Sequence, residues 1–584
     1  MLTENKLIAF KDLVNKVTRE ELIWINGYVS GILEQKNWIQ TRENTVIETV
    51  NLLPISNGIL PKPTIIYGTE TGNSKKIASQ LQAFLKKNKI SAKVFDASQY
   101  PLEKIEQEEL LLIVMSTQGE GEPPQSAAKF FNALHDRNFN LQNTKFAVFG
   151  LGDTSYPLFC QAAADVDVQL EKLGAKRILG LQKTDVDFAA TSQKWIENIA
   201  TILTSSTGIF ASETITTIAK PLENSKILEN HKQIYSGIIK HKVVLNDRGS
   251  NKETYHIEIA NNEKVAYSAG DALGVYPKNN TKSIEKVLQF FDTNAIKNLS
   301  EITEILATKS IRNLGKKTIS ALATLFEITI SEEKIDLIEF LTKYKSNSNN
   351  KQNIDIQQVM ALLNPITPRL YSISSAPDAH ENEVHLTVGL HKFTSNFDNN
   401  KTEKIGLASD FLANYPKNTQ LDFYIHKNPV FKLPAEDKDI IMIGAGTGIA
   451  PFRSFLFQRD AENASGKNWL IFGEQHFALD FYYQTEIQEF LSTGVLTKLD
   501  TAFSRDTKEK IYVQHRLKQQ ANTLYEWLEN GAYIYVCGQK NPMSIDVENT
   551  IIEIIAEKNK ISIEKATEKL AEIEAEGRYL KDVY

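Results

Sequence analysis

The chain has 584 residues, of which 42% are hydrophobic and 24% charged, so it can bury several cores and is not disordered by composition. Its 66 Lys and Arg against 72 Asp and Glu give a formal net charge of −6, which argues against a general nucleic-acid binder or a polybasic membrane anchor. The two cysteines, Cys160 and Cys537, are too few for a disulfide framework, a four-cysteine zinc site or an iron–sulfur cluster. No run of 18 apolar residues and no secretory signal is visible, so we expect a cytoplasmic chain. With so few cysteines we predict no metal site, and the length suggests about four domains.

Residues 1–60 are predicted to form a helical segment. Leu22, Ile25, Val29 and Ile32 recur at helical spacing and give the segment an apolar face. A segment this short cannot bury such a face by itself. It should therefore pack either on the rest of the chain or on another subunit, and the pattern alone leaves both open.

Residues 61–203 alternate short apolar strands with helices. The runs TIIY, AKVFD, LLLIVM and KFAVFG are each followed by a polar loop and a helical pattern, with a last strand over 176–181 and a last helix over 193–203. This alternation predicts a parallel sheet with helices on both faces. The Ser-, Thr- and Lys-rich stretch 204–232 that follows is predicted to be a linker.

Three loops of this domain follow the first, third and fourth strands, so they should meet at one edge of the sheet. The first loop lacks the lysine of a nucleotide triphosphate cradle, and taken alone it could be an ordinary capped turn. Together the loops suit a planar heterocycle with one phosphate, and they match the FMN site of the flavodoxin family. The candidate residues are Thr69, Glu70, Thr71, Gly72, Asn73 and Ser74; Ser116, Thr117, Gln118 and Gly119; and Leu151, Gly152, Asp153, Thr154, Ser155 and Tyr156.

Residues 233–432 are predicted to form an antiparallel β-barrel, interrupted by a helical insertion at about 280–365. Its chemistry lies in the strand RLYSISS. Arg369 can pair with a pyrophosphate, and Tyr371, on the same face, can cover a ring. An exposed Arg and Tyr on a strand can also be merely structural. With two companion stretches the pattern resembles the FAD motif of the ferredoxin–NADP⁺ reductase family; these are Thr387, Val388 and Gly389, and Gly406, Leu407, Ala408 and Ser409.

Residues 433–584 return to strand–helix alternation and begin with the turn GAGTGIAP, which contains Gly446 and Thr447. Such a turn at a helix N-terminus lets a pyrophosphate approach the backbone. A serine, an arginine, a lysine and a tyrosine near a later strand end suit a 2′-phosphate, so NADPH is preferred over NADH, although a solvated basic loop is the alternative. These candidates are Ser504, Arg505, Lys510, Ile511, Tyr512, Val513 and Gln514.

Two residues near the end of the chain have open interpretations. Cys537, at the end of the strand YIYVCG, is either a buried core thiol or a group that approaches a nicotinamide. Tyr584, the last residue, is either frayed or docked on a ring.

The order of these motifs resembles the NADPH-dependent diflavin reductase family. The segments STQGEGEPP, FAVFGLGDTSYPLFCQ, TPRLYSISS, IMIGAGTGIAPFRSF and the terminal RYLKDVY carry the resemblance, and within the family they are most similar to the flavoprotein subunits of assimilatory NADPH–sulfite reductase. The resemblance implies a multidomain α/β fold. It comprises a helical segment (1–60), a flavodoxin-like doubly wound sheet (61–203), a linker (204–232), an FAD-binding barrel with a helical insertion (233–432) and an NADPH-binding domain (433–584).

The resemblance also assigns roles to residues. It implies FMN contacts in the three loops and at Cys160. Hydride transfer would be assisted by Ser372, Cys537 and Asp582. Phe393 stands where a tyrosine is familiar, and Gly406-Leu407 replaces a Gly-Gly. The implied FAD contacts are Arg369, Leu370, Tyr371, Ser372, Thr387, Val388, Gly389, Phe393, Gly406, Leu407, Ala408, Ser409 and Tyr584. The implied NADPH contacts are Ser504, Arg505, Lys510, Ile511, Tyr512, Val513, Gln514 and Asp546.

The implied function is electron transfer from NADPH to FAD to FMN and on to a sirohaem and iron–sulfur hemoprotein subunit, which reduces sulfite to sulfide for cysteine biosynthesis. The resemblance further implies a homo-oligomer formed through the N-terminal segment. The first alternative is a soluble diflavin reductase that serves a haem monooxygenase or another one-electron acceptor. The second is a non-catalytic flavoprotein, and intact Ser372, Cys537 and Asp582 argue against it.

Overall fold

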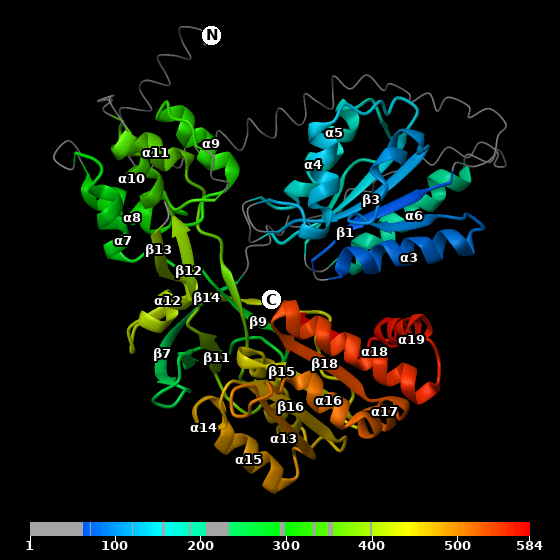
Figure 1. The fold of residues 1–584 in the computed structure, drawn as a ribbon, viewed down its shortest axis with the longest axis vertical. Coiled ribbons are helices and arrows are strands. Elements are labelled where there is room, and N and C mark those ends of the chain that lie inside the picture. The colour runs from blue at the N-terminus through cyan, green and yellow to red at the C-terminus, as the bar shows by residue number, and fades with distance from the viewer. Residues whose placement is uncertain are drawn as a thin grey trace, which may run out of the picture. The chain divides into compact units, whose positions relative to one another are not determined.

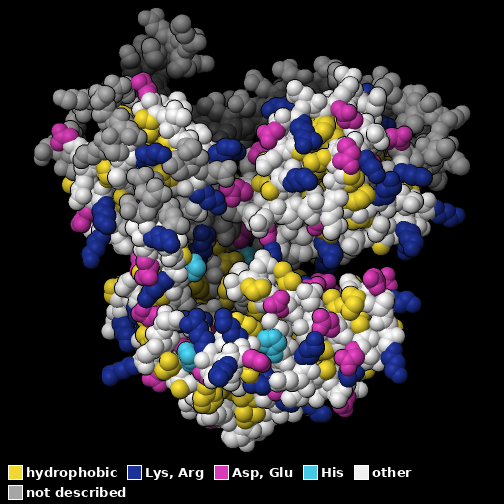
Figure 2. Space-filling model, viewed as in Figure 1, with side chains coloured by type: hydrophobic (Ala, Val, Ile, Leu, Met, Phe, Trp, Pro, Cys, Tyr) yellow, Lys and Arg dark blue, Asp and Glu magenta, His cyan; other side chains and the backbone are white. Residues whose placement is uncertain are grey.

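The computed structural model describes residues 62–70, 72–118, 121–154, 158–185, 188–205, 233–292, 298–330, 334–347, 354–397 and 400–584. The predicted N-terminal helical segment, and the linker from residue 206 to 232, lie outside these residues. None of the helices in the described ranges combines the length and the apolar character needed to cross a membrane. Basic and acidic side chains are interspersed over the face in Figure 2, in keeping with the small net charge.

Residues 62–205 form a doubly wound parallel sheet of the flavodoxin type, with the strand order β2-β1-β3-β4-β5 and β6 paired to β4. Helices α4 and α5 cover one face and α3 and α6 the other (Figure 1). Both faces are therefore buried, which explains why the central strands are continuous apolar runs. The elements are β1 (Thr64–Gly68), α3 (Asn73–Lys87), β2 (Lys93–Asp96), β3 (Leu110–Ser116), α4 (Ala128–Asp136), β4 (Lys145–Leu151), α5 (Gln161–Lys172), β5 (Lys176–Arg177), β6 (Gln182–Thr184) and α6 (Ala189–Ser205).

One prediction for this sheet was wrong in detail. A single strand is expected over 176–181, but two short segments pair with β4 instead. Residues 176–177 pair with the start of β4, and residues 182–184 pair with its end. The intervening residues form no ladder of their own, although the Ile178 amide still donates to the Phe146 carbonyl at 2.8 Å. The last helix also begins at Ala189, four residues before the predicted start.

The antiparallel strands after residue 233 form the expected barrel, in the order β10-β9-β14-β7-β8-β11. A bridge between Ile373, just beyond β10, and Leu386 of β11 closes it. In β7 exposed and buried residues alternate over the first half of the strand, as a barrel wall requires. The elements are β7 (Ile234–Val244), β8 (Thr254–Ala260), β9 (Ala272–Val275), β10 (Arg369–Ser372), β11 (Glu383–Gly389), the hairpin β12 (Lys392–Phe397) and β13 (Asn400–Ile405), α12 (Leu407–Asn414) and β14 (Gln420–His426).

A helical unit with its own apolar core is inserted between β9 and β10. Because the insertion leaves the barrel after one strand and returns at the neighbouring strand, it does not interrupt the ladder between β9 and β10. Its helices are α7 (Thr281–Leu288), α8 (Leu299–Ala307), α9 (Lys316–Leu325), α10 (Leu337–Asn347) and α11 (Ile356–Leu362).

The C-terminal residues form a second parallel sheet, ordered β17-β16-β15-β18-β19. Helices α13 and α15 pack on one face and α16 to α19 on the other (Figure 1). The last strand, β19, is not predicted from the sequence. The elements are β15 (Ile440–Ala445), α13 (Ala450–Ala461), β16 (Asn468–Glu474), α14 (Phe477–Asp480), α15 (Gln484–Thr493), β17 (Lys498–Phe503), α16 (Val513–Gln519), α17 (Ala521–Glu529), β18 (Tyr533–Gly538), α18 (Ile545–Asn559), α19 (Ile563–Ala575) and β19 (Tyr579–Val583).

Candidate functional site

The three predicted loops of the flavodoxin-like sheet do meet at one edge, because β1, β3 and β4 are neighbours and run parallel. The strand order reverses between β1 and β3, and ligands of such sheets bind in the crevice at this point. The first loop opens helix α3, a helix of 15 residues whose N-terminal amides can face an anion.

The turn that begins α3 is shaped for a phosphate. Thr69 Oγ1 accepts the Gly72 N–H at 2.9 Å, and Gly72 has a φ of 87°, which favours glycine. The Ser74 hydroxyl is fully buried, and within the described residues it has no hydrogen-bond partner. A buried hydroxyl is normally satisfied, so this one at a helix N-terminus fits a phosphate oxygen as its partner.

The other two loops are held in place by their own contacts. The Thr117 amide donates to the Leu151 carbonyl at 3.0 Å, which joins the second loop to the third. The Thr154 amide donates to Asp185 at 3.2 Å. The remaining candidates in these loops, Gly119, Ser155 and Tyr156, lie outside the described residues, as does Thr71 in the first loop; their roles stay predictions.

Cys160 is fully buried behind the third loop. Its Sγ lies 3.6 Å from the Thr184 carbonyl oxygen, and it would lie 3.0 Å from a Cβ placed on Gly152. Burial raises the pKa of the Cys160 thiol to about 11, so the thiol stays neutral at physiological pH. The side chain therefore supports the loop by packing.

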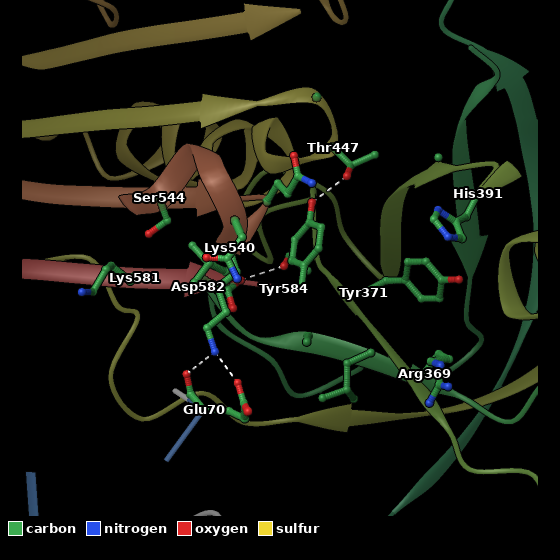
Figure 3. Close-up of a pocket in the computed structure, with 18 of the residues that line it drawn as sticks. Glu70, Arg369, Tyr371, His391, Thr447, Lys540, Ser544, Lys581, Asp582 and Tyr584 are labelled. Carbon is green, nitrogen blue, oxygen red and sulfur yellow. Dashed lines mark hydrogen bonds and ion pairs between the residues drawn. The ribbon is translucent and has the colours of Figure 1, made fainter. Parts of the chain in front are cut away.

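On the barrel, Arg369 and Tyr371 lie on one face of β10, as the period of two predicts. Leu370 lies between them on the strand, and its side chain is exposed although it is apolar. Figure 3 shows the Tyr371 ring with His391 above it, Arg369 below it and Tyr584 to its left. Because side chains alternate along a strand, Leu370 points to the other face of β10, where its exposed apolar surface is available to a ligand.

The turn 406–409 joins the same group through His391. The Gly406 amide donates to the His391 carbonyl at 2.8 Å. The His391 ring is stacked on Phe393, with centroids 5.4 Å apart. His391 thus contacts both the turn and Phe393, and Figure 3 shows its ring above that of Tyr371.

The stretch 387–389 contributes less side-chain surface than expected. Thr387 Oγ1 is buried and bonded to the Tyr483 hydroxyl at 2.7 Å. Val388 is fully buried in the barrel core. Gly389 is different, since a Cβ there would lie 3.2 Å from the Thr447 methyl carbon. A ligand at this stretch would therefore meet Gly389 and backbone atoms.

Ser372, Cys537 and Asp582, far apart in the sequence, converge on one point. Ser372 Oγ donates to Asp582 Oδ2 at 2.8 Å, and Cys537 Sγ lies 4.0 Å from the same oxygen. Cys537 and Asp582 are register partners in the adjacent strands β18 and β19. Burial raises the pKa of Asp582, and burial together with the Asp582 charge raises the pKa of Cys537 well above its usual value. Cys537 thus stays a thiol, and Asp582 holds a proton more readily than an exposed carboxylate.

The backbone of Tyr584 is held by hydrogen bonds, whereas the residue is largely exposed. Its amide donates to the Gly538 carbonyl at 3.1 Å, and its carbonyl accepts from the Lys540 amide at 3.0 Å. The hydroxyl is 2.6 Å from Thr447 Oγ1, yet the residue is 63% exposed (Figure 3). The ring can therefore swing without breaking β19.

The predicted nucleotide residues lie at the carboxyl edge of the second sheet. The Ser504 amide donates to the Glu474 carbonyl and the Arg505 amide to the Gln475 carbonyl, both at 2.9 Å. Gln514 Nε2 donates to Asp546 at 3.1 Å, so these two predicted NADPH contacts, which are distant in the sequence, lie side by side. Within 510–514 the side chains divide: the side chains at 510 and 512 are exposed, whereas those at 511 and 513 pack on the core.

The glycine turn after β15 is a place of close approach. A Cβ on Gly448 would lie 2.2 Å from the Cys537 carbonyl oxygen, so no other residue fits there. Gly446 has a φ of 58°, in the left-handed region. The turn thus lies directly against the strand end that carries Cys537.

Three charged residues of this region are not among the predicted site residues. The Glu474 carboxylate is buried beside Gly446 of the glycine turn, and it pairs with Lys252 from the barrel. Arg453, which follows the glycine turn on α13, is also buried. A buried charge needs a partner, but nothing local in the sequence marks which charged residues are buried.

Comparison with known proteins agrees with this architecture. Family models match for flavodoxin over residues 65–198, an FAD binding domain over 229–359 and an oxidoreductase NAD-binding domain over 442–549. The chain is 36% identical to the sulfite reductase (NADPH) flavoprotein alpha-component of Mannheimia succiniciproducens, with 98% of each chain covered. It is 35% identical to the same component of Photorhabdus laumondii and of Salmonella typhimurium, with 100% of this chain and 98% of each relative covered. Because the identity extends over almost the full length of both partners, this chain belongs to the family of sulfite reductase (NADPH) flavoprotein alpha-components.

Proposed function

We propose that this chain is the flavoprotein component of an NADPH-dependent sulfite reductase, passing electrons from NADPH through FAD and FMN to a hemoprotein subunit that reduces sulfite. The single observation that carries the proposal is that one chain contains two different flavin-type folds, the doubly wound sheet and the closed barrel with its nucleotide-binding sheet. A protein that moved electrons only between carriers of one kind would need only one of these two folds.

The residues fit the groups they would hold. The α3 turn with the unsatisfied Ser74 hydroxyl would hold the FMN phosphate. Arg369, Tyr371 and the turn 406–409 would hold FAD. Ser504, Arg505 and the exposed residues of 510–514 would hold the 2′-phosphate of NADPH.

When bound, the nicotinamide supplies a hydride and the two flavins convert an electron pair into single electrons. The chain's own task is positioning and proton control. Tyr584 would cover the FAD ring and would have to move aside for the nicotinamide. Asp582 accepts a hydrogen bond from Ser372 at Oδ2 and takes up a proton more readily than an exposed carboxylate, and Cys537 contributes a neutral thiol beside them. Ser372, Cys537 and Asp582 are the proposed catalytic residues.

The remaining assignments follow the sequence and the relatives' names. The proposed domains are 61–203 for FMN, 233–432 for FAD and 433–584 for NADPH, with 204–232 as linker. We place the protein in the cytoplasm and assign residues 1–60 to homo-oligomer contacts on the strength of their apolar face. The name alpha-component of the relatives supports a separate partner subunit, and the proposed partner is a sirohaem and iron–sulfur hemoprotein.

The test begins with the flavins. Full-length protein should release FMN and FAD in equal amounts and should reduce cytochrome c with NADPH. Mixed with a sirohaem hemoprotein, it should co-purify with that protein and support NADPH-dependent formation of sulfide. A single kind of flavin after reconstitution would reject the proposal. Cytochrome c reduction without sulfide formation would favour a diflavin reductase for another one-electron acceptor.

A further inference from the structure

Arg453 is a buried cation whose whole guanidinium is engaged. It is 6% exposed. Nε and Nη2 donate to the two carboxylate oxygens of Glu486 at 2.6 and 2.8 Å. Nη1 donates to the Ser374 carbonyl at 2.9 Å, and the guanidinium carbon lies 4.9 Å from the Tyr483 ring centroid. A planar fork with several donors is needed to satisfy these partners at once, and lysine offers no such fork.

One partner of Arg453, Ser374, lies on the seam between β10 and β11 that closes the barrel. Ser374 continues the strand that carries Ser372, and its amide donates to the His385 carbonyl at 2.8 Å. The next residue is held by the same helix, since Ser454 Oγ donates to the Ser375 carbonyl at 2.6 Å. Helix α13 thus binds two successive carbonyls just beyond Ser372.

Helix α13 also begins directly after the glycine turn of the nucleotide-binding sheet. One short rigid element therefore connects the proposed pyrophosphate turn to the strand that carries Ser372. Because Ser372 is bonded to Asp582, a shift of the segment 373–375 would be passed to the Ser372–Asp582 pair.

A metal site is the competing interpretation of this region. His256, Glu258 and His385 have potential ligand atoms within 4.8 Å of one another. However, Arg453 Nη1 lies 3.2 Å from His385 Nδ1, and because an arginine can only donate, Nδ1 must accept. The proton of His385 is then on Nε2, which donates to Glu383 at 3.0 Å. With that nitrogen protonated, His385 is not a metal ligand, and the group is a hydrogen-bonded network.

We propose that Arg453 is a positioning residue for hydride transfer, which locks the barrel seam at Ser374 and so fixes Ser372 and Asp582 relative to the nucleotide turn. This inference rests on the proposed function. Small displacements of a reacting geometry cost large factors in rate, so the effect should fall on the chemical step rather than on nucleotide binding.

The test compares two buried arginines of one helix in the full-length protein. Arg453→Met removes the guanidinium that binds Glu486 and the Ser374 carbonyl. Arg459→Met is the matched control, since Arg459 is 2% exposed and donates to the carbonyls of Lys438 and Gly466, which lie outside the barrel. Both variants should lose stability, and only the first should disturb the seam.

The first measurement is independent of nucleotide. Hydrogen exchange at the amides of Ile373 and Ser374 should be at least about tenfold faster in Arg453→Met and unchanged in Arg459→Met. The second is the stopped-flow rate of flavin reduction at saturating NADPH. It should fall about 10- to 100-fold in Arg453→Met, while the dissociation constant for NADP⁺ stays within about twofold. Arg459→Met should match the wild type in both.

Should Arg453→Met not fold, Arg453→Lys and Glu486→Gln replace it, with the same direction and a smaller loss of rate. The inference is overturned if a folded Arg453 variant exchanges and reduces flavin like the wild type, or if Arg459→Met slows flavin reduction equally. Failure of the wild type itself to reduce flavin with NADPH would instead reject the proposed function, and the exchange measurement would still decide whether Arg453 locks the seam.

Discussion

The Tyr584 ring offers a sharp test of the proposed nicotinamide site, because the free energy that holds it can be worked out from its contacts. The hydroxyl makes one neutral hydrogen bond, to Thr447 at 2.6 Å, which contributes about 1 kcal/mol net. The residue is 63% exposed, so of about 200 Å² for an aromatic side chain roughly 70 Å² is buried. At about 25 cal/mol per Å² this burial contributes about 2 kcal/mol. A nicotinamide that takes the place of the ring must overcome about 3 kcal/mol in total.

Removing this obstacle should help NADH more than NADPH, since NADPH has a 2′-phosphate to offset the cost. Tyr584→Ala should raise kcat/KM for NADH by up to about 100-fold, because each 1.4 kcal/mol corresponds to a factor of ten. Tyr584→Phe loses only the hydrogen bond and should gain about fivefold. Thr447→Val removes the same hydrogen bond from the other side and should match Tyr584→Phe.

The assay is steady-state reduction of ferricyanide with NADH and with NADPH, at equal FAD content for all variants. The ratio of the two kcat/KM values is the quantity of interest, since it cancels differences in active fraction. If Tyr584→Ala keeps that ratio within about twofold of the wild-type value, the ring does not compete with the nicotinamide and the reasoning fails.

Three further predictions address separate parts of the chain. Arg505→Ala should weaken NADPH use about 10- to 100-fold through loss of a charge-assisted bond to the 2′-phosphate and should spare NADH, so equal losses in kcat/KM for both would exclude that role. Ser74→Ala should lower FMN affinity about tenfold without lowering the thermal stability of the flavin-free protein, because its hydroxyl lacks a partner among the described residues; unchanged FMN affinity by fluorescence titration would contradict the phosphate assignment. Burial and the nearby Arg453 charge lower the pKa of His256 to about 3. Below pH 6.5 the unfolded chain therefore binds more protons than the folded one, and stability falls as pH falls toward 3, by about 2 kcal/mol at pH 5. His256→Gln should remove that loss, as urea midpoints at pH 7 and pH 5 would reveal, and an unchanged difference between them would count against it.

The sequence predicts the two parallel sheets and the barrel because each rests on local patterns. Buried strands such as LLLIVMS are continuous apolar runs, barrel strands alternate, and the loops that follow them contain the glycines, serines and threonines that a phosphate needs. The convergence of Thr69, Ser116 and Leu151 on one edge follows from parallel pairing alone. The split final strand at 176–184 could not be predicted, since its two pieces are defined only by where they touch β4.

Residue type and spacing are enough to settle the kind of chemistry at each loop, because they fix which ligand a strand end can hold. Which distant residues come together at the proposed catalytic site depends instead on how the chain folds. Asp582 reaches Cys537 because the five residues of β19 pair with β18, and a stretch with a lysine and an aspartate in its middle has no apolar pattern that indicates a strand. The partners of Arg453 likewise follow from the fold, because a charge is buried only when groups from several elements satisfy it together.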